Sequence, residues 1–138
     1  MSRSPNNYDL ALLFAAFADR TRLRLLNLMN GKEVCVCYFV EILGQSQPKI
    51  SRHLAYLRRA GIVAARREGK WMHYKIMAPA DAGAARILSE TLAVLREEDG
   101  MQRDLNRLRK ACCLPQKASA FGRAPRPAAT DALGCVTT

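Results

Sequence analysis

The stretch LGQSQPKISRHLAYLRRAGIV, residues 43–63, decides how this chain folds. Ser46 occupies the position of a helix N-cap, and Pro48 follows in the first turn, where a missing backbone N–H does no harm. The helix that begins here is expected to run to about Ala60 and to stop at Gly61. Apolar side chains recur along it at helical spacing and form the side expected to be buried: Ile50, Leu54 and Leu57.

The residues on either side of this helix predict the rest of a DNA-binding motif. Residues 35–44 form another short helix candidate, and only Gly44-Gln45-Ser46 joins the two. Two short helices with so tight a connection make a helix-turn-helix. Residues 62–67 and 71–77 are expected to be strands that turn at Gly69. A basic hairpin directly after the motif predicts a winged helix-turn-helix, which is a mainly α fold with a β-hairpin wing (α+β).

Helical spacing also predicts helices outside this motif. They are residues 8–18 with Asn7 as the cap, a helix from Asp19 to a stop at Gly31, and a long helical region after Pro79 that Gly100 kinks or weakens. Alternation along the second hairpin strand predicts two faces. We expect Met72, Tyr74 and Ile76 to join the core, and Trp71, His73 and Lys75 to share the opposite face.

The length of 138 residues suits one domain, which we assign to residues 1–114. Residues 115–138 are rich in Ala, Pro, Ser, Thr and Gly and are expected to form a disordered tail. The chain has no apolar run of about 18 residues, which argues against a membrane span. Its N-terminus lacks a secretory signal. We therefore expect a cytoplasmic protein whose five cysteines are thiols.

The charge balance favours a polyanionic partner. The chain carries 22 Lys and Arg against 12 Asp and Glu, a formal net charge of +10. Such an excess is typical of proteins that bind nucleic acid, although a basic tail alone would also produce it. With the helix-turn-helix and the hairpin, it predicts binding to double-stranded DNA.

The outward face of the second motif helix is small, polar and basic, and it suits the major groove. The base-edge candidates are Gln47, Ser51 and Arg52, and the phosphate candidates are Lys49, Arg58 and Arg59, with Tyr56 at the edge of the same surface. Arg66, Arg67 and Lys70 surround the hairpin turn and could contact the duplex backbone or a minor groove. The alternative is an ordinary solvated helix face.

Four segments in this order resemble the arsenic-responsive repressors of the ArsR/SmtB family: FADRTRLRLLNLM, EVCVC, LGQSQPKISRHLAYLRRAGIV and REGKWMHYKI. The resemblance covers about residues 8–78. It implies a homodimeric winged-helix repressor of the bacterial cytoplasm, which binds operator DNA when free of metal and releases it when the inducer binds. It also implies a dimer interface made by the first and last helices, so that residues 1–114 include dimerisation.

The resemblance marks Cys35 and Cys37 as ligands for trivalent arsenic or antimony. Thiolate sulfur is the soft ligand that such a thiophilic ion prefers. The family pattern often carries a third cysteine where this chain has Val40, and no histidine follows His73, so the family's zinc-type site looks absent. The third ligand could be Cys112 or Cys113 of either subunit, water or a small thiol. Those two cysteines could equally form a second site or be incidental. The alternative for Cys35 and Cys37 is that they are small buried apolar residues. Cys135 in the tail is not expected to be a ligand.

Helix geometry suggests how a ligand at these cysteines would act. Residues i and i+2 of a helix face apart, whereas in an extended segment they face the same way. Chelation by Cys35 and Cys37 would therefore unwind the start of the 35–44 helix and shift the population away from DNA binding.

These observations predict a non-enzymatic repressor whose inducer is As(III) or Sb(III) and which needs no catalytic cofactor. No catalytic constellation and no phosphate-cradling glycine loop is visible in the sequence. Two alternatives stay open. One is a winged-helix repressor in which a cysteine is oxidised instead of binding a metalloid. The other is a metalloid-handling protein that does not bind DNA.

Overall fold

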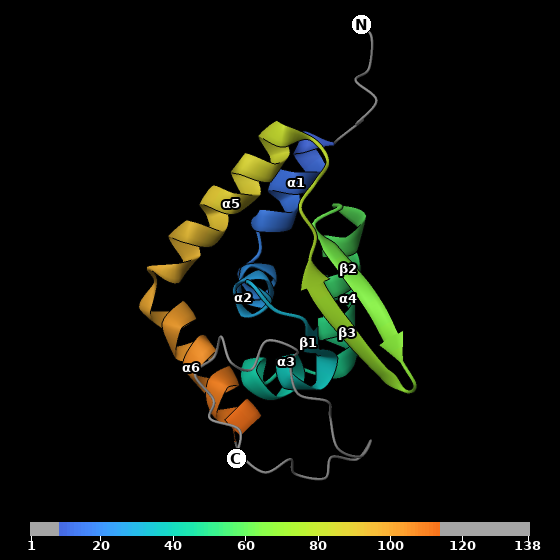
Figure 1. Cartoon of the computed structure of the whole chain (residues 1–138), viewed down its shortest axis with the longest axis vertical. Helices are drawn as coiled ribbons and strands as arrows, with labels where there is room; N and C mark the ends of the chain where they lie inside the picture. Colours follow the sequence, from blue (N-terminus) through green and yellow to red (C-terminus); the bar gives the residue numbers. More distant parts are fainter. Residues whose placement is uncertain (1–8, 114–138) are drawn as a thin grey trace, which may run out of the picture.

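The structure is a computed structural model that describes residues 9–113 (Figure 1). The expected tail, the Asn7 cap position and Cys135 lie outside these residues. Six helices and three strands make up the described part. In chain order they are α1 (Leu10–Phe17), α2 (Arg20–Leu28), β1 (Val34–Cys35), α3 (Val36–Leu43), α4 (Gln47–Arg59), β2 (Val63–Glu68), β3 (Trp71–Ile76), α5 (Ala82–Arg96) and α6 (Asp99–Cys113). No helix among residues 9–113 is long and apolar enough to cross a bilayer.

Side-chain caps set where the first helices begin. The prediction of Asn7 as the first cap is wrong, because the Asp9 carboxylate accepts the bond from the Leu12 amide at 3.1 Å. An aspartate at this position satisfies one of the amides that a helix start leaves without a partner. The predicted cap Asp19 is confirmed, since it accepts from the Arg22 amide at 3.0 Å.

The helix-turn-helix forms as its residues predict. Ser46 is the N-cap of α4, and Gly44 ends α3 with φ of 65°, a left-handed conformation that suits glycine. Ile50, Leu54 and Leu57 are fully buried. The preceding helix begins one residue later than predicted, because Cys35 is extended and belongs to β1.

The sheet has one more strand than the sequence predicts, and the hairpin strand β3 lies at its centre. The strand order is β1-β3-β2, and both pairs are antiparallel. The added strand has two residues, too few for any periodic signal. The expected burial of Tyr74 is confirmed. His73, on the opposite face of β3, is also buried, at 3% exposure, which the sequence did not predict.

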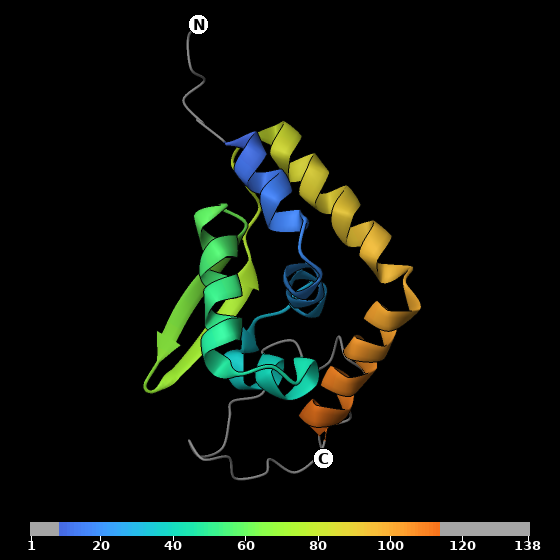
Figure 2. The same ribbon diagram turned by 180° about the vertical axis from the view of Figure 1, so that it is seen from behind.

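The long helical region after Pro79 is two helices, and the break lies at Glu97 and Glu98 rather than at Gly100. Gly100 instead lies in the first turn of α6. Figures 1 and 2 show α5 running beside α1 and α6 turning back towards α3, so that the two helices wrap around α2. The central helix α2 packs against every other helix.

A buried ion pair fastens α6 to α2. Arg24 donates two hydrogen bonds to the carboxylate of Asp104, from Nε at 2.7 Å and from Nη2 at 2.9 Å. Asp104 is 3% exposed. The hydrogen bond to Asp104 raises the pKa of Arg24, against the opposing effect of burial. Nearby, the amide of Asn27 donates to the backbone carbonyl of Met101 at 3.0 Å.

Replacing Asp104 with alanine is expected to lower the free energy of unfolding by about 2–4 kcal/mol, because the partly buried Arg24 guanidinium would lose its partner. The matched control, Glu98→Ala, breaks the exposed Arg20–Glu98 pair and is expected to cost about 1 kcal/mol or less. Urea unfolding at one protein concentration measures both. Equal losses would mean that the buried pair does not fasten α6.

Candidate functional site

The exposed face of α4 carries most of the residues expected to contact DNA. Gln47, Lys49, Arg52, Arg58 and Arg59 are exposed, and Ser51 is half-buried. The opposite side of the helix supplies the core residues already described, so α4 is held by its apolar side and presents its polar side outward. This arrangement is what a recognition helix requires.

Tyr56 has a different environment from its neighbours on α4. Its ring lies 4.2 Å from the guanidinium carbon of Arg22 and 5.0 Å from that of Arg59. Arg22 also donates to two carbonyls at the end of α1, those of Ala15 at 2.8 Å and Ala16 at 3.0 Å. Stacking of this kind attracts the cation to the ring. Tyr56 therefore ties α4 to α2 and α1 and positions Arg59, which sequence reasoning did not foresee.

The basic residues of the wing, the hairpin of β2 and β3, differ in their contacts. Arg67 and Lys70 are exposed at the tip. Arg66 is also exposed, but its guanidinium is bound by two carboxylates, those of Glu33 at 2.6 Å and Glu68 at 3.3 Å. Sequence reasoning missed Glu33, although it stands at the start of the segment EVCVC, because its partner is distant in the chain.

The two cysteines of that segment converge at the junction of β1 and α3. Cys35 is the N-cap of α3, with φ of −72° and ψ of 142°, and Cys37 lies in the first helical turn. The Cys37 thiol donates a hydrogen bond to the Cys35 sulfur at 3.3 Å. The expectation that the pair must unwind the helix before both sulfurs can face one ligand is wrong, because Cys35 is already outside the helix.

This separation suits chelation of a single ion. Two metal–sulfur bonds of about 2.3 Å each can span sulfurs up to about 4.6 Å apart, so the separation of 3.3 Å lies within the reach of one ion. Access is unequal, because Cys35 is fully buried and Cys37 is partly exposed. A ligand would therefore reach Cys37 first.

The pKa values of the two thiols shift in opposite directions. The hydrogen bond from Cys37 lowers the pKa of Cys35 to about 7, against the effect of burial and with help from the backbone amides of Cys37 and Val36. The same bond, together with burial and the charge on Cys35, raises the pKa of Cys37. Near neutral pH Cys35 is therefore partly ionised, and Cys37 keeps its proton.

A third ligand is not in place among the described residues. Within residues 9–113, no group of three or more His, Cys, Asp or Glu side chains is arranged to hold a metal ion. Cys112 is fully buried on α6. Burial lowers the pKa of Lys32, and the interaction of Lys32 with Cys112 opposes this change. Cys113 ends α6, and its side chain is outside the description. The roles of Cys112 and Cys113 as ligands stay predictions.

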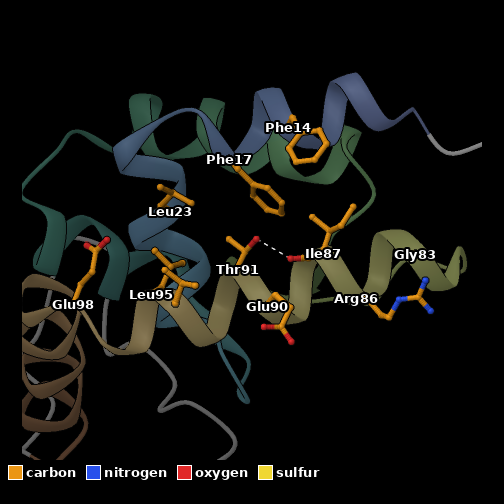
Figure 3. Close-up of a pocket in the computed structure, with 11 residues that line it drawn as sticks. Phe14, Phe17, Leu23, Gly83, Arg86, Ile87, Glu90, Thr91, Leu95 and Glu98 are labelled. Atoms are coloured by element: carbon orange, nitrogen blue, oxygen red, sulfur yellow. Dashed lines mark hydrogen bonds between the residues drawn. The ribbon is translucent and has the colours of Figure 1, made fainter.

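A large apolar groove lies on another side of the molecule, between α1, α2 and α5 (Figure 3). Its volume is about 840 Å³. Two of its lining residues are unusually exposed for apolar side chains, Phe14 at 51% and Val94 at 61%. Thr91, which lines the groove, donates its hydroxyl to the Ile87 carbonyl at 2.7 Å. The groove is therefore mainly hydrophobic, and an exposed apolar surface of this kind is typical of an interface.

Comparisons with known proteins point to one family. Residues 19–65 match the model of the bacterial regulatory proteins of the arsR family. The chain is 48% identical over 79 residues to the arsenical resistance operon repressor of Escherichia coli, covering 56% of this chain and 68% of that protein. It is also 48% identical over 66 residues to the arsenic resistance transcriptional regulator ArsR1 of Pseudomonas putida, covering 47% of this chain and 52% of that protein.

Solved structures give the same result for the fold. The antimony-specific transcriptional repressor AntR superimposes with a TM-score of 0.50 at 29% identity, covering 70% of this chain and 96% of AntR. HlyU from Vibrio cholerae superimposes with a TM-score of 0.51 at 28% identity, covering 61% of this chain and 88% of HlyU.

In Cys37→Ala, the pKa of Cys35 is expected to rise above its value of about 7, because the donor thiol is lost while burial persists. Less Cys35 thiolate would then be present at neutral pH. Residue-resolved NMR shifts of the cysteine β-carbons, followed as a function of pH, measure this change. Cys112→Ala is the control and is expected to leave the Cys35 titration unchanged. An unchanged titration in Cys37→Ala would assign the thiolate to the backbone amides.

Proposed function

We propose a working cycle for this chain from one premise: it belongs to the arsR family of bacterial regulatory proteins and is a transcriptional repressor, not an enzyme. In the proposed cycle the metalloid-free protein holds operator DNA, and As(III) or Sb(III) bound to Cys35 and Cys37 releases it. The observation that carries the proposal is the paired sulfurs, 3.3 Å apart, at the start of a helix of the DNA-binding motif.

Operator binding is assigned to α4 and the wing. The N-terminal part of α4 would enter the major groove, where Gln47, Ser51 and Arg52 reach base edges. The phosphate contacts would come from the other exposed cations of α4 and the wing: Lys49, Arg58, Arg59, Arg67 and Lys70. A protein with a net charge of +10 that binds in this way loses affinity as salt rises.

The inducer is assigned to the thiol pair from its chemistry. A trivalent metalloid is soft, and the site offers one thiolate and a second thiol that would lose its proton on binding. The names of the relatives add support, since two of them are regulators of arsenic resistance and AntR is antimony-specific. The remaining ligand position would be filled by water, a small thiol, or Cys112 or Cys113 of either subunit. In the cytoplasm, reducing conditions would keep these thiols available.

The release step would follow from the burial of Cys35. With none of its surface exposed, Cys35 leaves no room for a bonded atom, so binding must displace neighbouring segments. The adjacent helix α3 packs directly against α4. A metalloid that binds the displaced arrangement more tightly would therefore lower the population that fits DNA.

The apolar groove is assigned to dimerisation. It lies between α1 and α5 and exposes Phe14 and Val94, so a second copy of the chain could cover it. A two-fold dimer would place two copies of α4 in half-sites about one helical turn apart.

Redox sensing is the second candidate, and the low pKa of Cys35 favours it. An oxidised cysteine would need a resolving partner, and a disulfide between residues i and i+2 closes a small strained ring. Arsenite that releases DNA under strong reductant would argue against this candidate.

Two substitutions separate DNA binding from sensing. Arg52→Ala is expected to weaken operator binding about tenfold and to leave arsenite binding intact, because it removes a base-edge contact. Cys37→Ser is expected to bind the operator normally and to stay bound when arsenite is added. Fluorescence anisotropy of DNA from the upstream region, titrated under reductant with arsenite, methylated As(III), antimonite and zinc, measures both.

Arg103→Ala on α6 is the control for loss of one positive charge, and it is expected to change operator binding much less than Arg52→Ala. Normal release of DNA from Cys37→Ser would remove the thiol pair as the sensor.

Val94→Glu is expected to convert the dimer to a monomer, because the charge would be buried in the groove of the partner. Val94 is exposed in the single chain, so folding should survive. Sedimentation velocity measures the oligomeric state. The control is Met77→Glu, another exposed apolar position, which lies outside the groove and should stay dimeric. A dimeric Val94→Glu protein would place the interface elsewhere.

A further inference from the structure

One row of side chains joins the thiol site to the wing. In the register of the sheet, Cys35 of β1 faces His73 of β3, and His73 faces Arg66 of β2. Directly opposed residues of antiparallel strands project from the same face of a sheet. Cys35, His73 and Arg66 therefore line one face, so the buried thiol and a cation of the wing share the central histidine as their neighbour.

An ion pair between Glu33 and Arg66 spans the row of side chains formed by Cys35, His73 and Arg66. Glu33 and Arg66 come from opposite sides of β3, and Arg66 reaches across that strand to donate from Nη2 at 2.6 Å and from Nε at 3.1 Å. The side chain of Glu33 is only 16% exposed. Its hydrogen bond with Arg66 lowers the pKa of Glu33, so the carboxylate is charged at neutral pH. Forked contacts of this type are among the stronger hydrogen bonds in proteins.

Glu68 contacts both Arg66 and His73. Its carboxylate lies 3.3 Å from Nη2 of Arg66 and 3.1 Å from Nε2 of His73, although the second contact is not aligned as a hydrogen bond. These carboxylates and Arg66 explain why His73 is buried on the face of β3 opposite to Tyr74. The charge of Glu68 also acts on Cys35. The thiol site, the histidine and the wing cation therefore belong to one connected cluster.

Glu33 is close enough to Cys35 in the chain for a movement of the backbone at Cys35 to displace it. The two residues are separated by Val34, and residues i and i+2 of an extended segment lie on the same side. Cys35 has no exposed surface, so a metalloid atom bonded to its sulfur would displace the residues packed around it, β1 among them. Movement of β1 would change the distance between Glu33, which directly precedes this strand, and Arg66 on β2.

We propose that Glu33 is the positioning residue that couples the thiol site to the wing: its ion pair with Arg66 holds the wing in the position that fits operator DNA until the metalloid binds. This inference rests on the proposed function. Without metalloid, Glu33 fixes the wing against β1. With metalloid at Cys35 and Cys37, the Glu33–Arg66 pair opens and the wing loses its position.

The test is Glu33→Gln, which keeps the size of the side chain and removes its charge. Operator affinity is measured by fluorescence anisotropy with and without saturating arsenite, and arsenite affinity is measured on the DNA-free protein. We expect the metalloid-free operator affinity to fall about fivefold and the metalloid-loaded affinity to stay unchanged, so that the coupling between the two ligands falls by the same factor. Arsenite affinity of the DNA-free protein should stay close to that of the wild type.

Glu98→Gln is the matched control. It removes the same charge from another glutamate–arginine pair, Arg20–Glu98, far from the sheet in sequence and in contacts. The added positive charge alone would strengthen DNA binding slightly in both variants. A loss of affinity in Glu33→Gln that is absent in Glu98→Gln is therefore specific to the cluster. A double-mutant cycle of Glu33→Gln with Arg66→Gln should be non-additive if the two act as a pair.

Each outcome decides the inference. Unchanged coupling in Glu33→Gln overturns it. Tighter operator binding with normal release also overturns it, because Glu33 would then compete with DNA for Arg66. If Glu33→Gln melts well below the wild type, Glu68→Gln tests the same cluster from an exposed position and should lower the coupling by a smaller factor. If arsenite does not release the wild type, the proposed function itself has failed, and the coupling role falls with it.

Discussion

The backbone at Cys35 is extended, whereas the backbone from Val36 onward is helical, and this one change of conformation joins the two functional parts of the molecule. On one side, Cys35 pairs with β3 and belongs to the sheet that carries the wing. On the other, it caps α3, which packs against α4. In the proposed cycle, a ligand at this residue would act on the wing and on α4 together, because both pack against the elements that meet at this junction.

The rest of the fold keeps that junction in a defined position. Helix α2 lies at the centre and contacts every other helix (Figure 2). Arg22 links it to the end of α1 and to Tyr56 on α4, and Arg24 links it to Asp104 on α6. These arginines have buried or stacked partners, so they act as fixed connections rather than as surface charges. A basic protein thus divides its cations between holding the fold and contacting DNA.

The chemistry of the thiol pair depends on the same geometry. Because Cys35 lies outside the helix, its sulfur can accept hydrogen bonds from the Cys37 thiol and from the backbone amides at the start of α3. These bonds favour a thiolate at Cys35 even though it is fully buried. Had both cysteines been inside α3, their sulfurs would have pointed apart, and the preformed pair would not exist. Secondary structure therefore brings the two sulfurs together before any ligand binds.

Local features of this chain were determined by its sequence. The cap at Ser46, the left-handed Gly44 and the buried stripe of α4 follow from spacing and residue type, because they depend on neighbours within a few positions. The cysteine pair and the exposed basic face were visible in the same way. Tertiary structure decided the strand at Val34–Cys35, the burial of His73 and the capture of Arg66 by Glu33. The strand and the ion pair join residues more than 30 positions apart in the sequence, and such contacts leave no periodic pattern, because only the folded backbone brings their partners together.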